Sequence, residues 1–110
     1  MEKTADLTNL ASILLVGLDD TAATVCARAI RPIPTFQVAT PDACEEALRR
    51  RSLVIVMPIG LTPNDEAAIL DTAHLYGAET VVMDRFDDAS VVSSTLLDAL
   101  RKAERRRLAR

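Results

Sequence analysis

The sequence predicts an α/β fold, a three-layer sandwich in which helices cover both faces of a parallel sheet. Short apolar segments alternate along the chain with segments whose apolar residues recur at helical spacing, a pattern typical of parallel sheets. The expected strands also differ in composition: central strands are apolar throughout, whereas a strand exposed on one side alternates. Numbered along the chain, the four expected strands therefore take the spatial order 2-1-3-4, with right-handed crossovers between them.

The first expected strand and helix fall within residues 13–30. Residues 13–18 are almost entirely apolar, which places this strand at the centre of the sheet. Asp19 and Asp20 follow it and supply an N-cap and a first-turn acid for a helix. The apolar residues of that helix recur at i, i+3, i+4, i+7 and i+8: Ala22, Val25, Cys26, Ala29 and Ile30. The two prolines of residues 31–34 then end it.

The second strand and helix follow directly. Residues 35–39 alternate polar and apolar side chains, so this strand is expected at an edge of the sheet. Thr40 and Pro41 have the composition of an N-cap followed by a first-turn proline, which predicts a helix over residues 42–51. Residues 53–57 are continuously apolar and form the second central strand.

The last third of the chain repeats the alternation. Thr62 is a predicted N-cap with Asp65 at the capping-box position, and Gly77 suits the C-terminal cap of that helix. Residues 79–84 form the fourth strand, and a final helix begins near Ala89. The inner face of this last helix is predicted to consist of Val92, Leu96, Ala99, Leu100 and Ala103.

Length and composition indicate one domain. The chain has 110 residues, of which 49% are hydrophobic and 3% aromatic, so we expect a short tail over residues 1–11 and one domain over residues 12–110 with a core of aliphatic side chains. No apolar run approaches the roughly 20 residues of a membrane span. The first residues also lack the basic start and apolar stretch of a signal peptide. A cytoplasmic location without membrane partners is expected.

The charge is divided unevenly between the body and the C-terminus. Residues 1–100 carry a net charge of −8, whereas residues 101–110 hold six cations and one anion. Cations at the end of a helix are favoured by its dipole, and this is the preferred interpretation because no aromatic residue accompanies them to stack on bases. The alternative is a docking surface for nucleic acid or for an acidic protein.

Other chemistries find little support in the sequence. Cys26 and Cys44 fall at apolar helix positions and are interpreted as buried small side chains, while the single His74 is placed on a helix surface. No Walker A or Gly-x-Gly-x-x-Gly pattern occurs. No cofactor and no enzymatic activity are expected.

Acidic residues gather at one predicted edge of the sheet. Ligands of open parallel sheets bind beyond the carboxyl ends of the strands, where the strand order reverses. Here that place is predicted to be lined by Asp19, Asp20, Met57 and Pro58, with Asp84 farther along the same edge. Asp19 and Asp20 are weak candidates for binding Mg²⁺ or Ca²⁺, which prefer oxygen ligands. The more common arrangement is that Asp20 caps a helix and Asp19 is solvated.

Several motifs, in order, resemble those of response-regulator receiver domains, which have a flavodoxin-like fold. The resemblance covers roughly residues 12–105 and lies in residues 13–16 followed by Asp19-Asp20, in Glu46-Ala47-Leu48, and in Gly77-Ala78 and Phe86 around the last strand. In receivers the acidic pair binds Mg²⁺ and an aspartate after the third strand accepts phosphate. In this chain that place falls on Met57, or on Val54 in the alternative alignment. The family's lysine falls on Asp84.

The departures imply a degenerate receiver. Residues 59–76 leave room for one helical crossover only, so one βα unit of the five-stranded receiver, with its switching Thr or Ser, is missing. We therefore expect a non-phosphorylatable module that binds another signalling or regulatory protein in bacteria, and that forms a homodimer. Nucleic-acid association through the basic tail and a metal-binding receiver remnant are the alternatives. The expected partner-binding residues are Leu97, Arg101, Lys102, Arg105 and Arg106.

Overall fold

A computed structural model describes residues 12–108, with side chains described as far as Arg106. The predicted tail over residues 1–11 and the last two residues lie outside the described residues.

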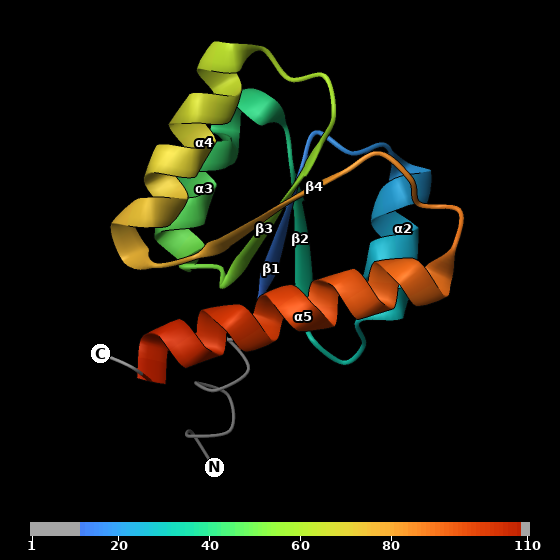
Figure 1. Cartoon of the computed structure of the whole chain (residues 1–110). Helices are drawn as coiled ribbons and strands as arrows, with labels where there is room; N and C mark the ends of the chain where they lie inside the picture. Colours follow the sequence, from blue (N-terminus) through green and yellow to red (C-terminus); the bar gives the residue numbers. More distant parts are fainter. Residues whose placement is uncertain (1–11, 109–110) are drawn as a thin grey trace.

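Four strands form one parallel sheet in the predicted order, β2-β1-β3-β4 (Figure 1). The strands are β1 (Ile13–Val16), β2 (Thr35–Val38), β3 (Val54–Pro58) and β4 (Glu79–Met83). Leu14 of β1 lies beside Phe36 of β2 on one side and Ile55 of β3 on the other. The continuously apolar strands are therefore central, and the alternating β2 is at an edge, as its composition predicts. The second edge is formed by β4.

Within residues 12–108, four helices and one short 3₁₀ helix accompany the strands, and the last helix follows β4. They are α2 (Asp20–Ala29), η1 (Thr40–Asp42), α3 (Ala43–Arg50), α4 (Pro63–Tyr76) and α5 (Ala89–Leu108). Helices α2 and α5 pack on one face of the sheet, and α3 and α4 lie side by side on the other (Figure 1). The predicted three-layer α/β sandwich is confirmed. Within residues 12–108, no helix is both long and apolar enough to cross a membrane.

The core consists of two clusters, one on each face of the sheet. Alternate residues of the central strands supply them, because successive side chains of a strand point to opposite faces. Ile13 and Val54 belong to the cluster under α2 and α5, and Leu14 and Ile55 to the cluster under α3 and α4. The predicted inner face of the last helix is confirmed, since each of its five residues is at most 5% exposed.

Helix ends follow the local sequence, with one exception. Thr62 Oγ1 accepts a hydrogen bond from the Asp65 N–H at 3.2 Å, and Gly77 ends α4 in the left-handed conformation with φ of 81°. The prediction that Thr40 is the N-cap of the next helix is wrong. Thr40 instead begins η1, and α3 begins at Ala43 with no side-chain cap from Asp42. The 3₁₀ turn satisfies the backbone locally, since the Asp42 N–H donates to the Ala39 carbonyl.

Candidate functional sites

The carboxyl edge of the sheet is shaped by the turn after β1. Gly17 has φ of 65°, and a Cβ at this position would lie 2.8 Å from Thr40 Oγ1. The turn therefore needs a glycine both for its backbone conformation and for the close approach of Thr40. It delivers Asp19 and Asp20 to the start of α2, at the place that the sequence predicts.

Both carboxylates that follow the turn are engaged in local contacts. The expectation that Asp20 rather than Asp19 caps α2 is wrong. Asp19 is the N-cap of α2, and its Oδ1 accepts a hydrogen bond from the Ala22 N–H at 2.8 Å. The Oδ1 of Asp20 accepts one from Gln37 Nε2 at 3.3 Å, and the same Gln37 nitrogen also donates to the Leu18 carbonyl at 3.1 Å. These contacts join the start of α2 to β2, so the acidic pair stabilises the turn.

The predicted site residues separate into two hollows. Asp19 and Asp84 line a hollow of about 270 Å³ together with Pro58 and Phe86. Asp20 lines a different one, beside Gln37 and Thr40. The structure therefore brings Asp19 and Asp84 together and places Asp20 on the other side of the Gly17 turn.

Met57 does not line this edge, which corrects the prediction. Its side chain is fully buried in the core cluster under α3 and α4. The reason is strand alternation, because Met57 lies two residues after Ile55 and points to the same face. Pro58, the next residue, is half-buried and reaches the hollow of Asp19 and Asp84. Counting the alternation through to the end of the strand would have shown this in advance.

The metal-binding hypothesis has few ligands available. Among the described residues, no three His, Cys, Asp or Glu side chains converge in a way that could hold a metal ion. Of the three acids predicted at this edge, Asp19 and Asp84 share a hollow, and one oxygen of Asp19 is already used as a helix cap. The exposed His74 on α4 lies elsewhere, lining a hollow with Arg106.

The C-terminal helix carries the predicted partner-binding residues, all of them exposed. Arg106 reaches across to the start of β4. One guanidinium nitrogen lies 2.7 Å from Glu79 Oε1, an ion pair without the alignment of a hydrogen bond, and another donates to the Ala78 carbonyl at 3.3 Å. Lys102 Nζ lies 3.4 Å from an Asp98 carboxylate oxygen. Part of the predicted basic surface is thus paired within the chain.

The predicted partner-binding residues do not share one side of α5. Helical spacing puts Lys102, four residues before Arg106, on the side that faces β4. Leu97 lies nine residues before Arg106 and therefore roughly half a turn around the axis. The structure brings Lys102 and Arg106 to the β4 side, and places Leu97 away from it.

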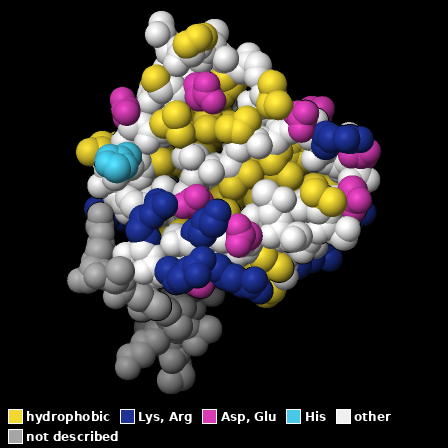
Figure 2. All heavy atoms as spheres, in the orientation of Figure 1, with side chains coloured by type: hydrophobic (Ala, Val, Ile, Leu, Met, Phe, Trp, Pro, Cys, Tyr) yellow, Lys and Arg dark blue, Asp and Glu magenta, His cyan; other side chains and the backbone are white. Residues whose placement is uncertain are grey.

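The open edge of β4 is a further surface that the sequence analysis does not predict as a site. In Figure 1 this strand lies in front, and Figure 2 shows hydrophobic side chains across the middle of the same face, with Lys and Arg side chains gathered below them. Val82 of β4 is 47% exposed and Leu70 of α4 is 42% exposed. We name the outer side of β4, from Ala78 to Asp84, the β4 edge.

Along the β4 edge, odd-numbered and even-numbered residues direct their backbone N–H and C=O groups to opposite sides of the strand. The Glu79 N–H donates to the Leu53 carbonyl, so Glu79, Val81 and Met83 direct their backbone groups toward β3. Thr80 and Val82 direct theirs away from the sheet. The Ala78 carbonyl also points outward, where it accepts a hydrogen bond from Arg106. Thr80 and Val82 therefore carry the outward N–H and C=O groups of the strand.

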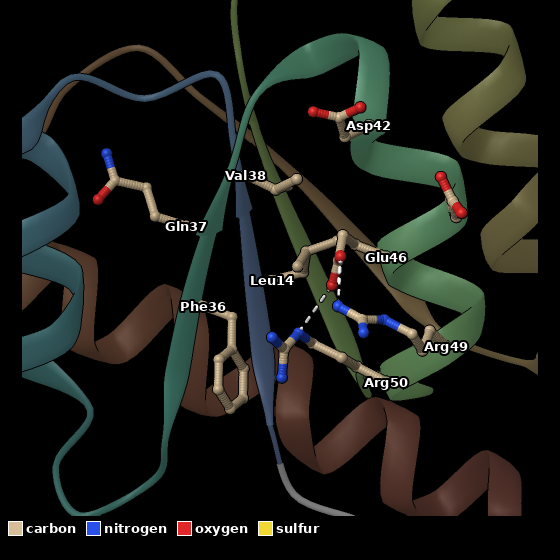
Figure 3. A pocket seen from close by; sticks show the side chains of 9 residues that line it. Leu14, Phe36, Gln37, Val38, Asp42, Glu46, Arg49 and Arg50 are labelled. Carbon is tan, nitrogen blue, oxygen red and sulfur yellow. Dashed lines mark hydrogen bonds and ion pairs between the residues drawn. The ribbon is translucent and has the colours of Figure 1, made fainter.

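A third surface lies beside the other edge strand. A hollow of about 360 Å³ lies between β2 and α3, and in it the Arg50 guanidinium stacks 3.8 Å from the centre of the Phe36 ring. Figure 3 shows the side chains that line it. Glu46 pairs with Arg49 and with Arg50, whose Nε is 3.0 Å away. Desolvation raises the pKa of Glu46, but the hydrogen bonds and charges of the two arginines lower it overall. These charged groups are paired with one another, and Arg50 covers the Phe36 ring.

Comparison with known proteins gives no relative. No family model matches the chain, and no curated protein or solved structure is significantly similar to it. The class of protein is therefore defined by the fold, an α/β sandwich with a four-stranded parallel sheet.

Proposed function

We propose that this chain is a protein–protein interaction module of a bacterial regulatory system, a receiver-like domain that carries no phosphotransfer. The observation that supports this most is the β4 edge, where exposed apolar side chains and outward backbone groups lie beside the cations of α5. Contiguous apolar surface rimmed by polar residues is typical of protein interfaces. A strand edge with free N–H and C=O groups adds directional contacts for a partner.

The contacts at the carboxyl edge fit a structural role for its acidic residues. Asp19 caps α2, and Asp20 binds Gln37. Met57, which takes the place of the phosphoacceptor in the receiver resemblance, is fully buried and belongs to the core. In this proposal the cytoplasmic module has kept the sheet and helices of a receiver and uses its outer surface for recognition.

The test is a pull-down from the source cells in which captured protein and nucleic acid are both quantified. The bait is the full chain, compared with a variant in which Lys102, Arg105 and Arg106 are replaced by glutamine. A matched control replaces Arg28, Arg31 and Arg49, which lie on α2, its following turn and α3. A defined regulatory protein captured by the full chain and by the control supports the proposal. Capture of nucleic acid alone contradicts it.

Nucleic-acid association is the second candidate function. It is favoured by the exposed Arg101, Lys102, Arg105 and Arg106 on one helix, and weakened by the internal pairing of Lys102 and Arg106. Phosphate contacts release counterions, so binding of this kind falls steeply with salt. Fluorescence anisotropy with labelled duplex DNA and single-stranded RNA over a salt series is the direct measurement. Absence of binding at low salt eliminates this candidate.

A further inference from the structure

The β4 edge has a charge distribution that suits a second copy of the same chain. At the carboxyl end of β4 the exposed charged residues are Asp84, Arg85, Asp87 and Asp88, which carry a net charge of −2. At the other end lies Arg106, next to Ala78 and Glu79. A two-fold axis through the middle of the strand would bring the acidic end of one copy against the basic end of the other. Such a pairing is isologous, as in most dimers.

The backbone parity of the β4 edge limits the register to those in which outward-facing residues lie opposite one another. We propose that two copies pair through antiparallel β4 strands centred on Val81, which joins their sheets into one of eight strands. Thr80 of each copy then faces Val82 of the other, and these are the residues whose backbone groups point outward. Each such pair exchanges two hydrogen bonds, so the junction has four. This inference rests on the proposed function and names a second copy of the chain as the occupant of the β4 edge.

The same register also brings opposite charges of the two copies near one another. With Val81 on the axis, Asp84 of one copy lies opposite Ala78 of the other, whose carbonyl is held by Arg106. Each Asp84 therefore approaches the Arg106 of the second copy, once at each end of the junction. Glu79 lies opposite Met83, so no like charges meet directly, which would be destabilising. The exposed Val82 side chain packs beside Thr80 of the second copy, a favourable β-branched pair.

The opposite edge of the sheet is less suited to such pairing. Strand β2 is preceded by Pro32 and Pro34 and followed by Pro41, and prolines at an edge strand hinder the addition of another strand. The exposed residue of β2 is the polar Gln37, and its Phe36 ring is covered by Arg50. The β4 edge offers Val82 instead.

The experiment is sedimentation velocity of the full chain over a concentration series up to the high micromolar range. We expect the apparent mass to be that of a dimer at high concentration and to fall to that of a monomer on dilution. Val82→Lys places a charge on the junction without removing a core side chain, and should leave the monomer at every concentration. Leu48→Lys on α3 is the matched control, since Leu48 is 48% exposed and Val82 is 47% exposed. It should retain the dimer.

A cysteine at the axis tests the register independently of stability. In a Cys44→Ser background, Val81→Cys should form a disulfide-linked dimer under mild oxidation, because the two Val81 residues face each other. Gln37→Cys on the β2 edge should remain monomeric. A wild-type chain that stays monomeric at all concentrations overturns the inference, as does a dimer lost in Leu48→Lys but kept in Val82→Lys. A monomer that still captures a regulatory protein overturns self-pairing alone and leaves the proposed function standing.

Discussion

Arg106 and Glu79 form an ion pair that ties the end of α5 to the start of β4. The two side chains are 27 positions apart in the chain, and their charged atoms lie 2.7 Å apart. The Arg106 side chain is 51% exposed whereas that of Glu79 is 19% exposed, so solvent and salt screen the pair from one side. The contact positions the basic half of α5 beside the β4 edge.

Loss of this pair should cost little stability. Arg106→Gln removes the charge but keeps a side-chain donor for the Ala78 carbonyl. Exposed pairs typically contribute about 0.2–1 kcal/mol, so we expect a loss in this range that shrinks at high salt. Urea unfolding at low and high NaCl measures it. Arg101→Gln, on the far side of the same helix, is the control, and an equal loss in both variants would contradict a specific role for the pair.

The turn after β1 should be sensitive to any side chain at Gly17. Gly17→Ala combines a positive φ with a Cβ 2.8 Å from Thr40 Oγ1, and we expect a loss of about 1–2 kcal/mol. Gly60→Ala is the comparison, because Gly60 has φ of 105° but no atom within 4 Å of the added Cβ. Adding Thr40→Ala to Gly17→Ala should recover the steric part only. If all three variants unfold at the same urea concentration as wild type, the turn is not constrained as described.

Local rules were sufficient to predict most of the fold. The alternating residues of β2 placed it at the edge, and the spacing of Val92 and Leu96 identified the buried face of α5. Both signals act within one element, where the geometry of a helix or strand is fixed. Met57 was misplaced although the same alternation, continued from Ile55, points it into the core.

Contacts between distant elements could not be predicted in this way. The Arg106–Glu79 pair depends on how α5 is rotated on the sheet, and that rotation results from packing of the whole face. The grouping of Asp19 with Asp84, and the separation of Asp20, depends on the turn at Gly17. The order 2-1-3-4 did imply that β4 is an edge strand. Which of its backbone groups face outward required the register with β3.

Cys26 should make the stability of the fold decrease at alkaline pH. Burial raises the pKa of the Cys26 thiol from 9.0 to about 11. The folded chain therefore holds this proton to higher pH than the unfolded chain does. The corresponding stability is fully present below pH 9 and is lost as the pH rises toward 11. The slope contributed by one such group is at most about 1.4 kcal/mol per pH unit.

Urea unfolding at pH 7, 9 and 10 measures this dependence. Cys26→Ala should be less stable at pH 7, because it leaves a small cavity, but should lose less stability between pH 9 and 10 than wild type. The half-buried Cys44 provides the control, and Cys44→Ala should retain the alkaline loss. An unchanged slope in Cys26→Ala would show that another group causes it.

Substitutions of Asp19 can distinguish its role as a helix cap from a metal-binding role that needs its negative charge. As the N-cap of α2 it accepts the Ala22 N–H, so Asp19→Ala should cost about 1 kcal/mol, whereas Asp19→Asn keeps an accepting oxygen and should cost a few tenths. A metal role predicts something different, because asparagine cannot replace a carboxylate charge at a cation site shared with Asp84. Thermal unfolding with and without millimolar MgCl₂ distinguishes the two. We expect the midpoint of wild type and of Asp19→Asn to be unaffected by Mg²⁺. A rise in wild type that disappears in Asp19→Asn would instead identify the hollow beside Asp84 as a metal site and revive the receiver-remnant interpretation.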